Sequence, residues 1–504
     1  MTFNTIAFAL FMPLVFALYW LVCRGRLRAQ NILLLAASYL FYGWWDWRFL
    51  GLLIFSTLVS WACALPTKRR LTWTAVAVAA NLVVLGFFKY FNFFGDNLRW
   101  LFQTFGLNID WVTIEILLPV GISFYTFQAI SYNIDVYRGN TPVCRSPLTF
   151  ALFVAFFPQL VAGPIERSTQ LMPQLTRARS FDYGQAVEGM RLILWGLFKK
   201  CAVADGLGLL VDLAWGDPAG VPAKNCLMAV MFFPLQVYAD FSGYSDIAKG
   251  TAALLGVRLM DNFLFPFYSR NAIEFWQRWH RSLMQWFTQY VYIPLGGSRT
   301  GHRLRNVCVV FILSGLWHGA NWTYVMWGVL CALWYAADYR RHATLYKPGD
   351  GQVAGRRDAV HIALTFVIFA ATVIVFRAPT MPAAWTMTVH VAPLFAAVAV
   401  AMLVFAWAVT KVRNLMYYCL LGAAMAALIQ AVHSPANMVH VLNYLPVVFA
   451  VVMLCAEWRA RTHTFALQVM PANPVARYAV YMGLYLVVWV TAMGSEGAFI
   501  YFRF

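Results

Sequence analysis

The stretch WTAVAVAANLVVLGFFKYF, residues 73–91, has one charged side chain among its 19 residues. An apolar helix of about 20 residues is long enough to cross the hydrocarbon core of a bilayer. The whole sequence has the same character, because 62% of its 504 residues are hydrophobic and only 12% are charged. A soluble domain carries roughly a quarter charged residues. We therefore predict an all-α protein that crosses a membrane several times.

Other apolar stretches occur along the whole chain, and several of them are too short to span a bilayer unaided. Such short pieces are expected to be re-entrant or interfacial, buried against other helices. We predict about 11–14 membrane segments in total, with the least certain boundaries between residues 148 and 316. The further stretches are residues 4–22, 31–42, 49–65, 114–130, 148–162, part of 187–213, 227–238, 307–316, 324–337, 359–376, 389–409, 416–431, 439–456 and 478–492.

One polar break, which includes Lys347-Pro348-Gly349-Asp350-Gly351, interrupts the second half of the sequence. Its turn residues and charges predict a loop. No repeat or low-complexity tract is visible, so we predict a single membrane domain, residues 1–504. Within it we distinguish N-terminal helices (1–116), a polar-rich core region (117–337), the loop (338–358) and C-terminal helices (359–504).

Basic residues gather in short loops between the apolar stretches. Arg24, Arg26 and Arg28 mark one loop and residues 68–70 mark another, two crossings later. Because cytoplasmic loops retain lysine and arginine, the N-terminus is predicted to be periplasmic and these loops cytoplasmic. The net charge of +18 is spread over such loops and forms no basic domain, so nucleic acid is not an expected partner.

The nine cysteines are scattered through or beside the apolar segments, and none shows Cys-x-x-Cys spacing. This distribution is typical of packing residues and does not indicate a disulfide framework or a zinc site. We expect no bound metal.

Residues 271–292 are strongly amphipathic and include His280. Aromatic and apolar side chains recur at three- and four-residue intervals, while Glu274, Arg278 and Arg281 fall on the opposite side. The pattern predicts one helix that lies near the membrane interface. His280 falls at the edge of the apolar face and is predicted to project inward. A lone interfacial histidine is usually a structural hydrogen-bonding residue, so His280 by itself is weak support for a site.

His318 lies in the segment LWHGAN, residues 316–321, between apolar stretches. An ionisable residue in such surroundings is a functional-site hypothesis by default. Gly315 and Gly319 leave room around the imidazole for a substrate or for another backbone. A buried neutral imidazole can take a proton from a hydroxyl or a thiol. The alternative is a core histidine bonded to a neighbouring carbonyl, and Asn321 fits either interpretation.

A loop after residue 292 combines glycines with arginines. Backbone amides and guanidinium groups are suited to the phosphates of a coenzyme, and we predict a cytoplasmic donor-side contact here. An ordinary positive-inside loop is the equally supported alternative. The candidate residues are Gly296, Gly297, Arg299, Arg303 and Arg305.

A polar run follows the apolar residues 231–237 and includes Asp240, Ser242 and Tyr244. The run is suited to line an acceptor tunnel, and the alternative, which we predict here, is a hydrogen-bonded break in a helix. Lys199 and Lys200 are predicted to end a helix at the cytoplasmic interface.

Taken in order, seven segments resemble the membrane-bound O-acyltransferase (MBOAT) family, and specifically its bacterial alginate O-acetyltransferase-like branch. Any one segment could arise by chance, but the ordered set is specific and extends over most of the chain. The segments are LPVGISFYTFQ (118–128), FFPQLVAGPI (156–165), DFSGYSDIA (240–248), RWH (278–280), YIPLGG (292–297), LWHGAN (316–321) and FIYFRF (499–504).

The resemblance implies a helical bundle around a central tunnel and acyl transfer from a cytoplasmic thioester to a hydroxyl. The family's near-invariant histidine falls on His318, and a second family position falls on His280. Trp317, Asn321, Asp240, Ser242 and Tyr244 become candidates for substrate binding. His318 is expected to act as a general base, with His280 assisting; a covalent acetyl-histidine is the open alternative.

The branch also implies a location in the bacterial inner membrane, acetyl-CoA as the donor substrate and no tightly bound cofactor. It implies a separate periplasmic, serine-esterase-like transferase as partner and a polysaccharide acceptor. Alginate is favoured by resemblance, with cellulose-like exopolysaccharide and peptidoglycan as alternatives. A transporter of polysaccharide or small molecules is the competing class, and paired broken helices in an inverted repeat would favour it.

Overall fold

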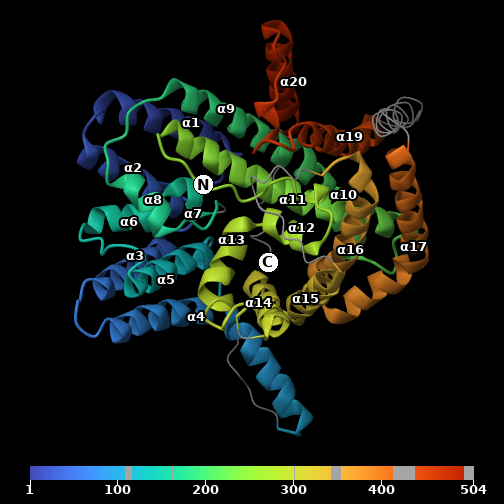
Figure 1. Cartoon of the computed structure of the whole chain (residues 1–504), viewed down its shortest axis with the longest axis horizontal. Coiled ribbons are helices and arrows are strands. Elements are labelled where there is room, and N and C mark those ends of the chain that lie inside the picture. Colours follow the sequence, from blue (N-terminus) through green and yellow to red (C-terminus); the bar gives the residue numbers. More distant parts are fainter. Residues whose placement is uncertain (108–115, 162, 300, 342–353, 412–437, 493–504) are drawn as a thin grey trace. The chain divides into compact units, whose positions relative to one another are not determined.

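In the computed structural model, the described residues are 1–504 except 108–115, 162, 300, 342–353, 412–437 and 493–504 (Figure 1). Every element in this described part is a helix. It forms two compact units, each built from several stretches of sequence. The first contains Met1–Met190, Ala248–Met260 and Trp317–Asn321, and the second contains Arg191–Ile247, Asp261–Leu316 and Trp322–Phe504.

The first unit is formed mainly by the N-terminal helices. Its elements are α1 (Ile6–Ala17), η1 (Leu18–Val22), α2 (Leu27–Gly43), α3 (Trp47–Ala64), α4 (Arg70–Thr104), α5 (Ile122–Arg138), α6 (Pro147–Ala155), α7 (Phe157–Leu160), α8 (Ser168–Leu175) and the start of α9 (Tyr183–Leu197). Helix α6 begins where Ser146 caps it, since the Ser146 hydroxyl accepts a bond from the Thr149 amide and Pro147 is at the first helical position.

Helix α5 starts at a glycine that no other residue could replace without strain. Gly121 has a φ of +75°, and a Cβ there would lie 2.5 Å from the Leu160 carbonyl oxygen. Both the left-handed backbone and the close approach of α7 therefore require glycine. This contact fixes the start of α5, whose side chains Phe124 and Phe127 contact Trp317.

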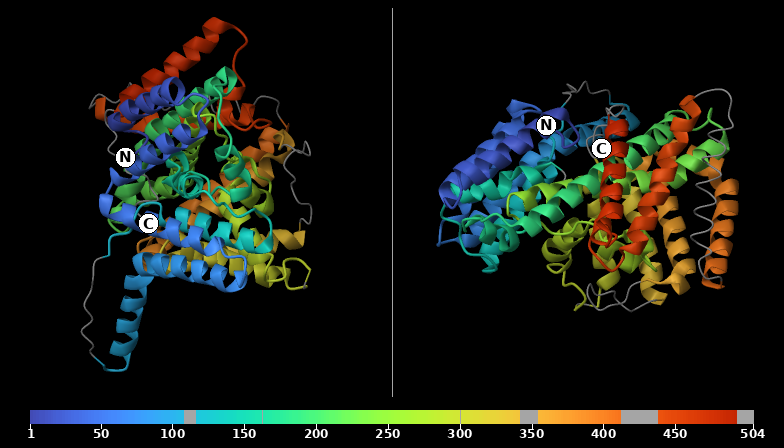
Figure 2. Two further views of the ribbon diagram at one scale, coloured as in Figure 1. Left: turned by 90° about the vertical axis from the view of Figure 1, so that its left-hand side faces the viewer. Right: turned by 90° about the horizontal axis from the view of Figure 1, so that it is seen from above.

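The second unit holds most of the core and C-terminal helices. Its elements are η2 (Phe198–Ala204), α10 (Asp205–Gly216), α11 (Ala223–Leu254, ending in the first unit), η3 (Pro266–Tyr268), α12 (Ala272–Arg278), α13 (Arg281–Phe287), η4 (Thr288–Tyr292), α14 (Arg303–His318), α15 (Trp322–Arg341), η5 (Arg356–Asp358), α16 (Ala359–Arg377), α17 (Met381–Lys411), α19 (Met438–Arg459), η6 (Ala466–Gln468) and α20 (Pro474–Ala492). Helices α16 and α17 lie side by side in every view (Figures 1 and 2).

Six described helices are long and apolar enough to cross a membrane. They are Trp47–Ala64, Arg70–Thr104, Ala223–Leu254, Arg356–Arg377, Met381–Lys411 and Pro474–Ala492. In α20 none of the described side chains is buried although the helix is apolar, as expected for a helix that faces lipid. The predicted all-α, multi-pass membrane fold is confirmed, while the number of crossings and the single domain stay predictions.

Three sequence-based expectations about helices were wrong. The polar run that includes Asp240 is not a break in a helix, because it lies within the uninterrupted helix α11. Residues 271–292 do not form one helix, because α12 ends at Arg278 and α13 starts at Arg281, with His280 in left-handed backbone between them. Lys199 and Lys200 do not end a helix either; they lie inside the π-helical segment η2, which continues directly from α9 into α10. At each of these segments, buried polar contacts outweigh the preference indicated by the local sequence pattern.

Some predicted features lie outside the described residues. They are the apolar stretch 416–431, residues 342–353 of the polar loop, Thr300 in the arginine-rich loop, and the closing hexapeptide 499–504.

Candidate active site

His318 is the last residue of α14 and is buried. The hairpin of α14 and α15 that precedes and follows it depends on two glycines. A Cβ at Gly315 would overlap the Tyr324 carbonyl group, and one at Gly328 would lie 2.5 Å from the Phe311 carbonyl oxygen. Gly315 thus allows the close approach of another backbone, which is one of the two roles predicted for it.

In the first unit, the end of α14 is held by an ammonium group from an apolar helix. The Nζ of Lys89 in α4 donates hydrogen bonds to the Trp317 carbonyl, to the His318 carbonyl at 3.4 Å and to the Ser123 hydroxyl at 3.4 Å. It also lies 5.5 Å from the centre of the Trp317 ring. The last carbonyls of a helix have no partner within it and carry partial negative charge, so a cation is stabilising here.

Trp317 links His318 to α5 through its ring. The indole contacts Phe124 and Phe127, with ring centres 5.6 and 5.9 Å away, and the His318 ring, with centres 4.9 Å apart. Asn321 lies half-buried in the turn between α14 and α15. The predicted site residues Trp317, His318 and Asn321 therefore lie together in the first unit, with Lys89 as a neighbour that the sequence-based analysis did not identify.

His280 belongs to the second unit and has an unusual backbone. Its φ is +44°, one of three positive values at residues other than glycine in the described part of the chain. Such a conformation is uncommon for a side chain with a Cβ and persists only where the surrounding structure enforces it. The enforcing contacts come from Asn262. Its backbone carbonyl oxygen accepts a hydrogen bond from the Arg281 amide, and its side-chain Oδ1 accepts one from the Ser282 hydroxyl.

The same Asn262 side chain sets the protonation of the His280 ring. Asn262 Oδ1 lies 3.1 Å from His280 Nδ1, and it can only accept, so Nδ1 carries the proton and Nε2 carries the lone pair. Burial lowers the pKa of His280 from 6.5 to about 3, which keeps the ring neutral at physiological pH. The prediction that His280 projects inward is confirmed, since the residue is buried.

Asn262 also joins His280 to the polar run of α11. Its Nδ2 donates to the Ser245 hydroxyl at 3.3 Å, and the rings of Phe241 and His280 contact edge to face, with centres 4.6 Å apart. Asn262 lies between helices in a stretch without a recognisable motif. Its role follows only from contacts 17–20 residues away along the chain.

The polar run of α11 meets the two lysines of η2 in the interior of the second unit. A close approach of Gly196 and Gly243, where a Cβ on the first would lie 2.5 Å from the carbonyl oxygen of the second, brings the helices together. Lys199 Nζ then contacts Asp246 at 2.7 Å and Ser242 at 2.9 Å. Lys200 Nζ contacts Asp240 at 2.7 Å and Asp205 at 2.8 Å.

Both ammonium groups are buried, and a buried charge is tolerated only when it is paired and hydrogen-bonded. Of the predicted substrate-binding residues, Asp240 and Ser242 therefore have a lysine partner, and Tyr244 places its ring centre 5.9 Å from Lys200 Nζ. π-helical segments within α-helices are frequent at functional sites. The sequence signal that could have revealed this cluster was the adjacent pair of lysines inside an apolar stretch.

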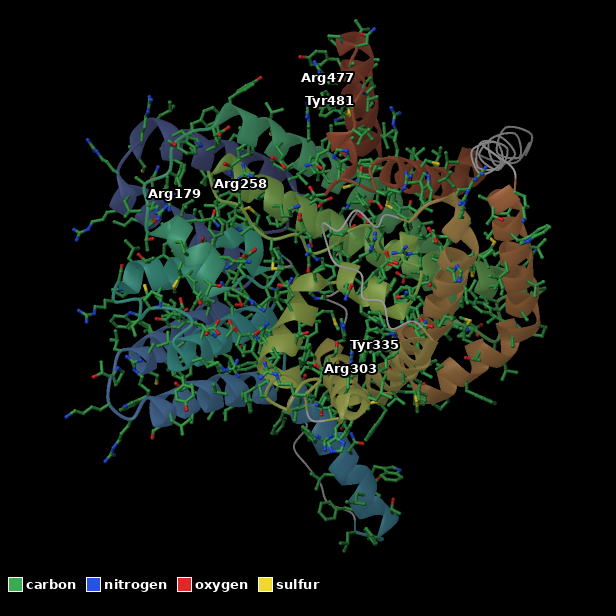
Figure 3. All side chains as sticks on the ribbon, viewed as in Figure 1. Arg179, Arg258, Arg303, Tyr335, Arg477 and Tyr481 are labelled. Atoms are coloured by element: carbon green, nitrogen blue, oxygen red, sulfur yellow. The ribbon has the colours of Figure 1, made fainter. Side chains whose placement is uncertain are left out.

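A cavity of about 430 Å³ lies between α12, α13 and η4 on one side and α14 and α15 on the other. Its wall includes Arg281 and Arg303, and Figure 3 labels Arg303 together with Tyr335, which lines it from α15. Three buried polar atoms of the wall have no hydrogen-bond partner among the described residues: Arg303 Nε, Gln277 Oε1 and Trp276 Nε1. Buried polar groups are normally satisfied, so this cavity is suited to a ligand with polar groups.

The structure separates the residues of the predicted donor loop. Arg303 lines the cavity and stacks on Tyr339, with its guanidinium carbon 4.2 Å from the ring centre. Arg305 instead bonds the side chain of Asn306 at 3.2 Å, and Arg299 is exposed. The Asn306 side chain donates to the Gly297 carbonyl at 2.9 Å, which holds the glycine turn against α14.

No cluster of three or more possible metal ligands occurs in the described ranges of the chain.

Comparisons with known proteins define the class to which this chain belongs. The model of the membrane-bound O-acyltransferase family matches residues 142–338, a range that contains η2, His280, the cavity and His318. The chain belongs to this family, and the predicted enzyme class, a membrane O-acyltransferase, is confirmed.

Individual relatives agree with this assignment. The chain is 42% identical to a probable alginate O-acetylase AlgI of Azotobacter vinelandii, over 65% of this chain and 66% of the relative, just under two thirds of its length. It is 39% identical to a probable alginate O-acetylase AlgI of Pseudomonas putida, over 74% of this chain and 76% of the relative. It is 33% identical to a peptidoglycan O-acetyltransferase of Helicobacter pylori, over 65% of this chain and 68% of the relative.

Proposed function

We propose that this enzyme transfers acetyl groups from cytoplasmic acetyl-CoA toward an extracytoplasmic polysaccharide, alginate, through a periplasmic serine-esterase-like partner. The observation that carries the proposal is the buried His318 at the end of α14, inside the range that matches the family. The names of relatives at 39–42% identity support acetyl as the group and alginate as the acceptor. Peptidoglycan, named for a relative at 33% identity, is the alternative acceptor.

The proposed reaction is a direct acyl transfer to a hydroxyl. The His318 imidazole takes the proton of the acceptor hydroxyl while the hydroxyl oxygen attacks the thioester carbonyl carbon. The carbon–sulfur bond then breaks, and the leaving thiolate receives the proton from the imidazole. The products are an O-acetyl ester and the free thiol. His280, protonated on Nδ1, is proposed to orient one reacting group through its Nε2.

The donor is proposed to bind in the cavity lined by Arg281 and Arg303. Coenzyme A carries phosphates, for which guanidinium groups are good partners, and amides, whose N–H groups would satisfy Gln277 Oε1. The volume of about 430 Å³ falls within the range of about 300–1,000 Å³ that is usual for small-molecule sites. The unpartnered Arg303 Nε is the atom that supports this assignment most directly.

Replacement of His318 tests the mechanism. We expect His318→Ala to lower the release of free thiol from acetyl-CoA, measured with acceptor present, by about 100- to 10,000-fold, since general-base help is worth that much. The abundance of the protein in the membrane should stay the same. His463→Ala removes an exposed histidine and should leave turnover unchanged. Normal turnover by His318→Ala at equal abundance would remove His318 from the mechanism.

A further inference from the structure

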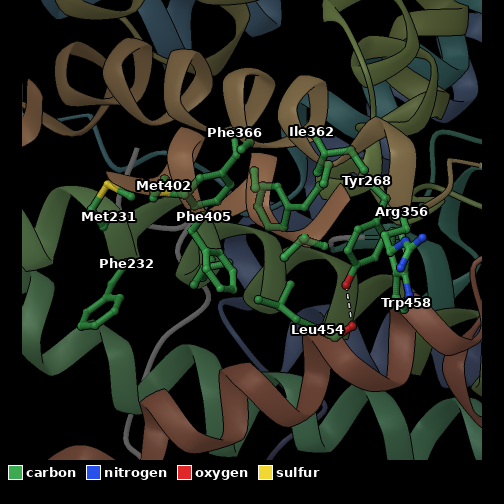
Figure 4. A pocket seen from close by; sticks show the side chains of 16 residues that line it. Met231, Phe232, Tyr268, Arg356, Ile362, Phe366, Met402, Phe405, Leu454 and Trp458 are labelled. Carbon is green, nitrogen blue, oxygen red and sulfur yellow. Dashed lines mark hydrogen bonds between the residues drawn. The ribbon is translucent and has the colours of Figure 1, made fainter. Parts of the chain in front are cut away.

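A second cavity, larger than the one at Arg303, lies between α11, η3, α16, α17 and α19 in the second unit. It measures about 820 Å³, and its two ends differ (Figure 4). Met231 and Phe232 line one end, whereas Tyr268, Arg356 and Trp458 line the other, with Phe366, Met402 and Phe405 between them. Apart from Arg356, every lining side chain is apolar or aromatic, so the cavity has an apolar length and one cationic end.

The position of this cavity relative to the spans indicates the depth at which each end lies. Its walls include three of the helices able to cross a membrane, Ala223–Leu254, Arg356–Arg377 and Met381–Lys411. Arg356 is the first residue of its span, and the end of a span lies near the membrane–water interface. Phe366 lies ten residues further along the same span, which corresponds to about 15 Å of helix, or about half of a hydrocarbon core.

Arg356 is available for a ligand at the cationic end of the cavity. It is exposed, and its side chain makes no hydrogen bond or ion pair with the described part of the chain. The nearest acidic residue in sequence, Asp358, accepts the Gly355 amide at 2.8 Å. Arg461 stacks on Trp458, with its guanidinium carbon 4.4 Å from the ring centre, and bonds the Ala354 carbonyl at 3.0 Å. A second cation therefore lies beside the same end.

We propose that this cavity binds an anionic phospholipid, with one acyl chain along Phe366, Met402 and Phe405 and the phosphate on Arg356. A guanidinium pairs well with phosphate through parallel hydrogen bonds. An apolar cavity at hydrocarbon depth excludes soluble polar ligands, and the arginine at the interface favours an amphiphile with a negative head. The lipid site is separate from the proposed donor cavity and does not depend on the proposed acyl transfer.

Lipid titration of the purified full-length protein tests this site. Brominated phosphatidylglycerol should quench the fluorescence of Trp458, measured as the difference between the wild type and Trp458→Phe. Arg356→Glu should weaken this binding by about tenfold, as expected for one charge-assisted contact. Arg357→Glu is the matched control, because Arg357 is also exposed but does not line the cavity, and it should leave binding within twofold. Ala363→Phe should fill the cavity and abolish the quenching.

Several outcomes would overturn the proposal. Equal weakening by Arg356→Glu and Arg357→Glu would show only nonspecific attraction to anionic lipid. If brominated phosphatidylcholine binds as tightly as brominated phosphatidylglycerol, and Arg356→Glu does not weaken it, the site does not recognise an anionic head group. If quenching has no Trp458 component, or if this face proves to be covered by a second copy of the chain instead of lipid, the cavity is not a lipid site.

Discussion

At the scale of single residues, Lys89 is the clearest positioning residue for the proposed catalytic histidine. Its ammonium group donates to the Trp317 and His318 carbonyls at the end of α14. Lys89→Met should leave these carbonyls less well satisfied and let His318 shift, and a misplacement of about 1 Å can cost about 100-fold in rate. We expect kcat for acetyl-CoA turnover to fall by about that factor while KM for the donor stays unchanged.

Rescue distinguishes positioning by Lys89 from a general loss of structure. Lys89→Arg keeps a cation that can reach the same carbonyls and should recover most of the rate. Lys68→Met removes an exposed charge just before α4 and should have no effect. The positioning role is wrong if Lys89→Met retains full kcat, or if Lys89→Arg is as inactive as Lys89→Met although both variants keep the thermal stability of the wild type.

The sequence predicted the chemistry-bearing residues better than their partners. His318 and the inward direction of His280 follow from patterns within a few residues of each. Lys89 and Asn262 are brought to these histidines by folding, and their separations of 229 and 18 residues leave no local signal. The pairing of Asp240 with Lys200 was missed for the same reason.

At the scale of elements, the all-α class and most apolar helices were predictable because their hydrophobicity is set by the bilayer. The break within residues 271–292 was not predictable, because the spacing of the apolar residues there fits a single helix. The break arises where Asn262 bonds the backbone and side chain of Ser282 and the Arg281 amide. Likewise, Glu274 and Arg278, which the pattern places opposite the apolar face, are buried and paired at 2.6 Å.

The elements around the proposed donor cavity lead to a graded prediction for three arginines at and just before the start of α14. Arg303→Gln should raise KM for acetyl-CoA about tenfold, the effect of one lost charge-assisted contact, because Arg303 begins α14 and lines the cavity. Arg299→Gln and Arg305→Gln remove the same charge outside the cavity and should change KM less than twofold. The measurement is the concentration dependence of thiol release from acetyl-CoA.

Equal effects of the three substitutions would contradict a specific donor site. They would instead support an ordinary positive-inside loop, whose arginines act through net charge. A second test uses coenzyme A itself as a competitive ligand, which should protect the wild type from thermal unfolding more than it protects Arg303→Gln.

At the scale of the whole molecule, the distribution of basic residues predicts from which side the donor is used. The loops around Arg26 and Arg69 and the segment that leads into α14 at Arg303 carry the excess of positive charge expected for cytoplasmic segments. Acetyl-CoA does not cross a bilayer, since its charged phosphates are costly to place in hydrocarbon. Inverted vesicles, with the cytoplasmic face outward, should therefore consume external acetyl-CoA, whereas right-side-out vesicles should do so only after permeabilisation. A protease-accessible tag at the N-terminus should be cleaved only in right-side-out vesicles. Donor use by intact right-side-out vesicles would place the donor site on the periplasmic side and reverse the predicted orientation.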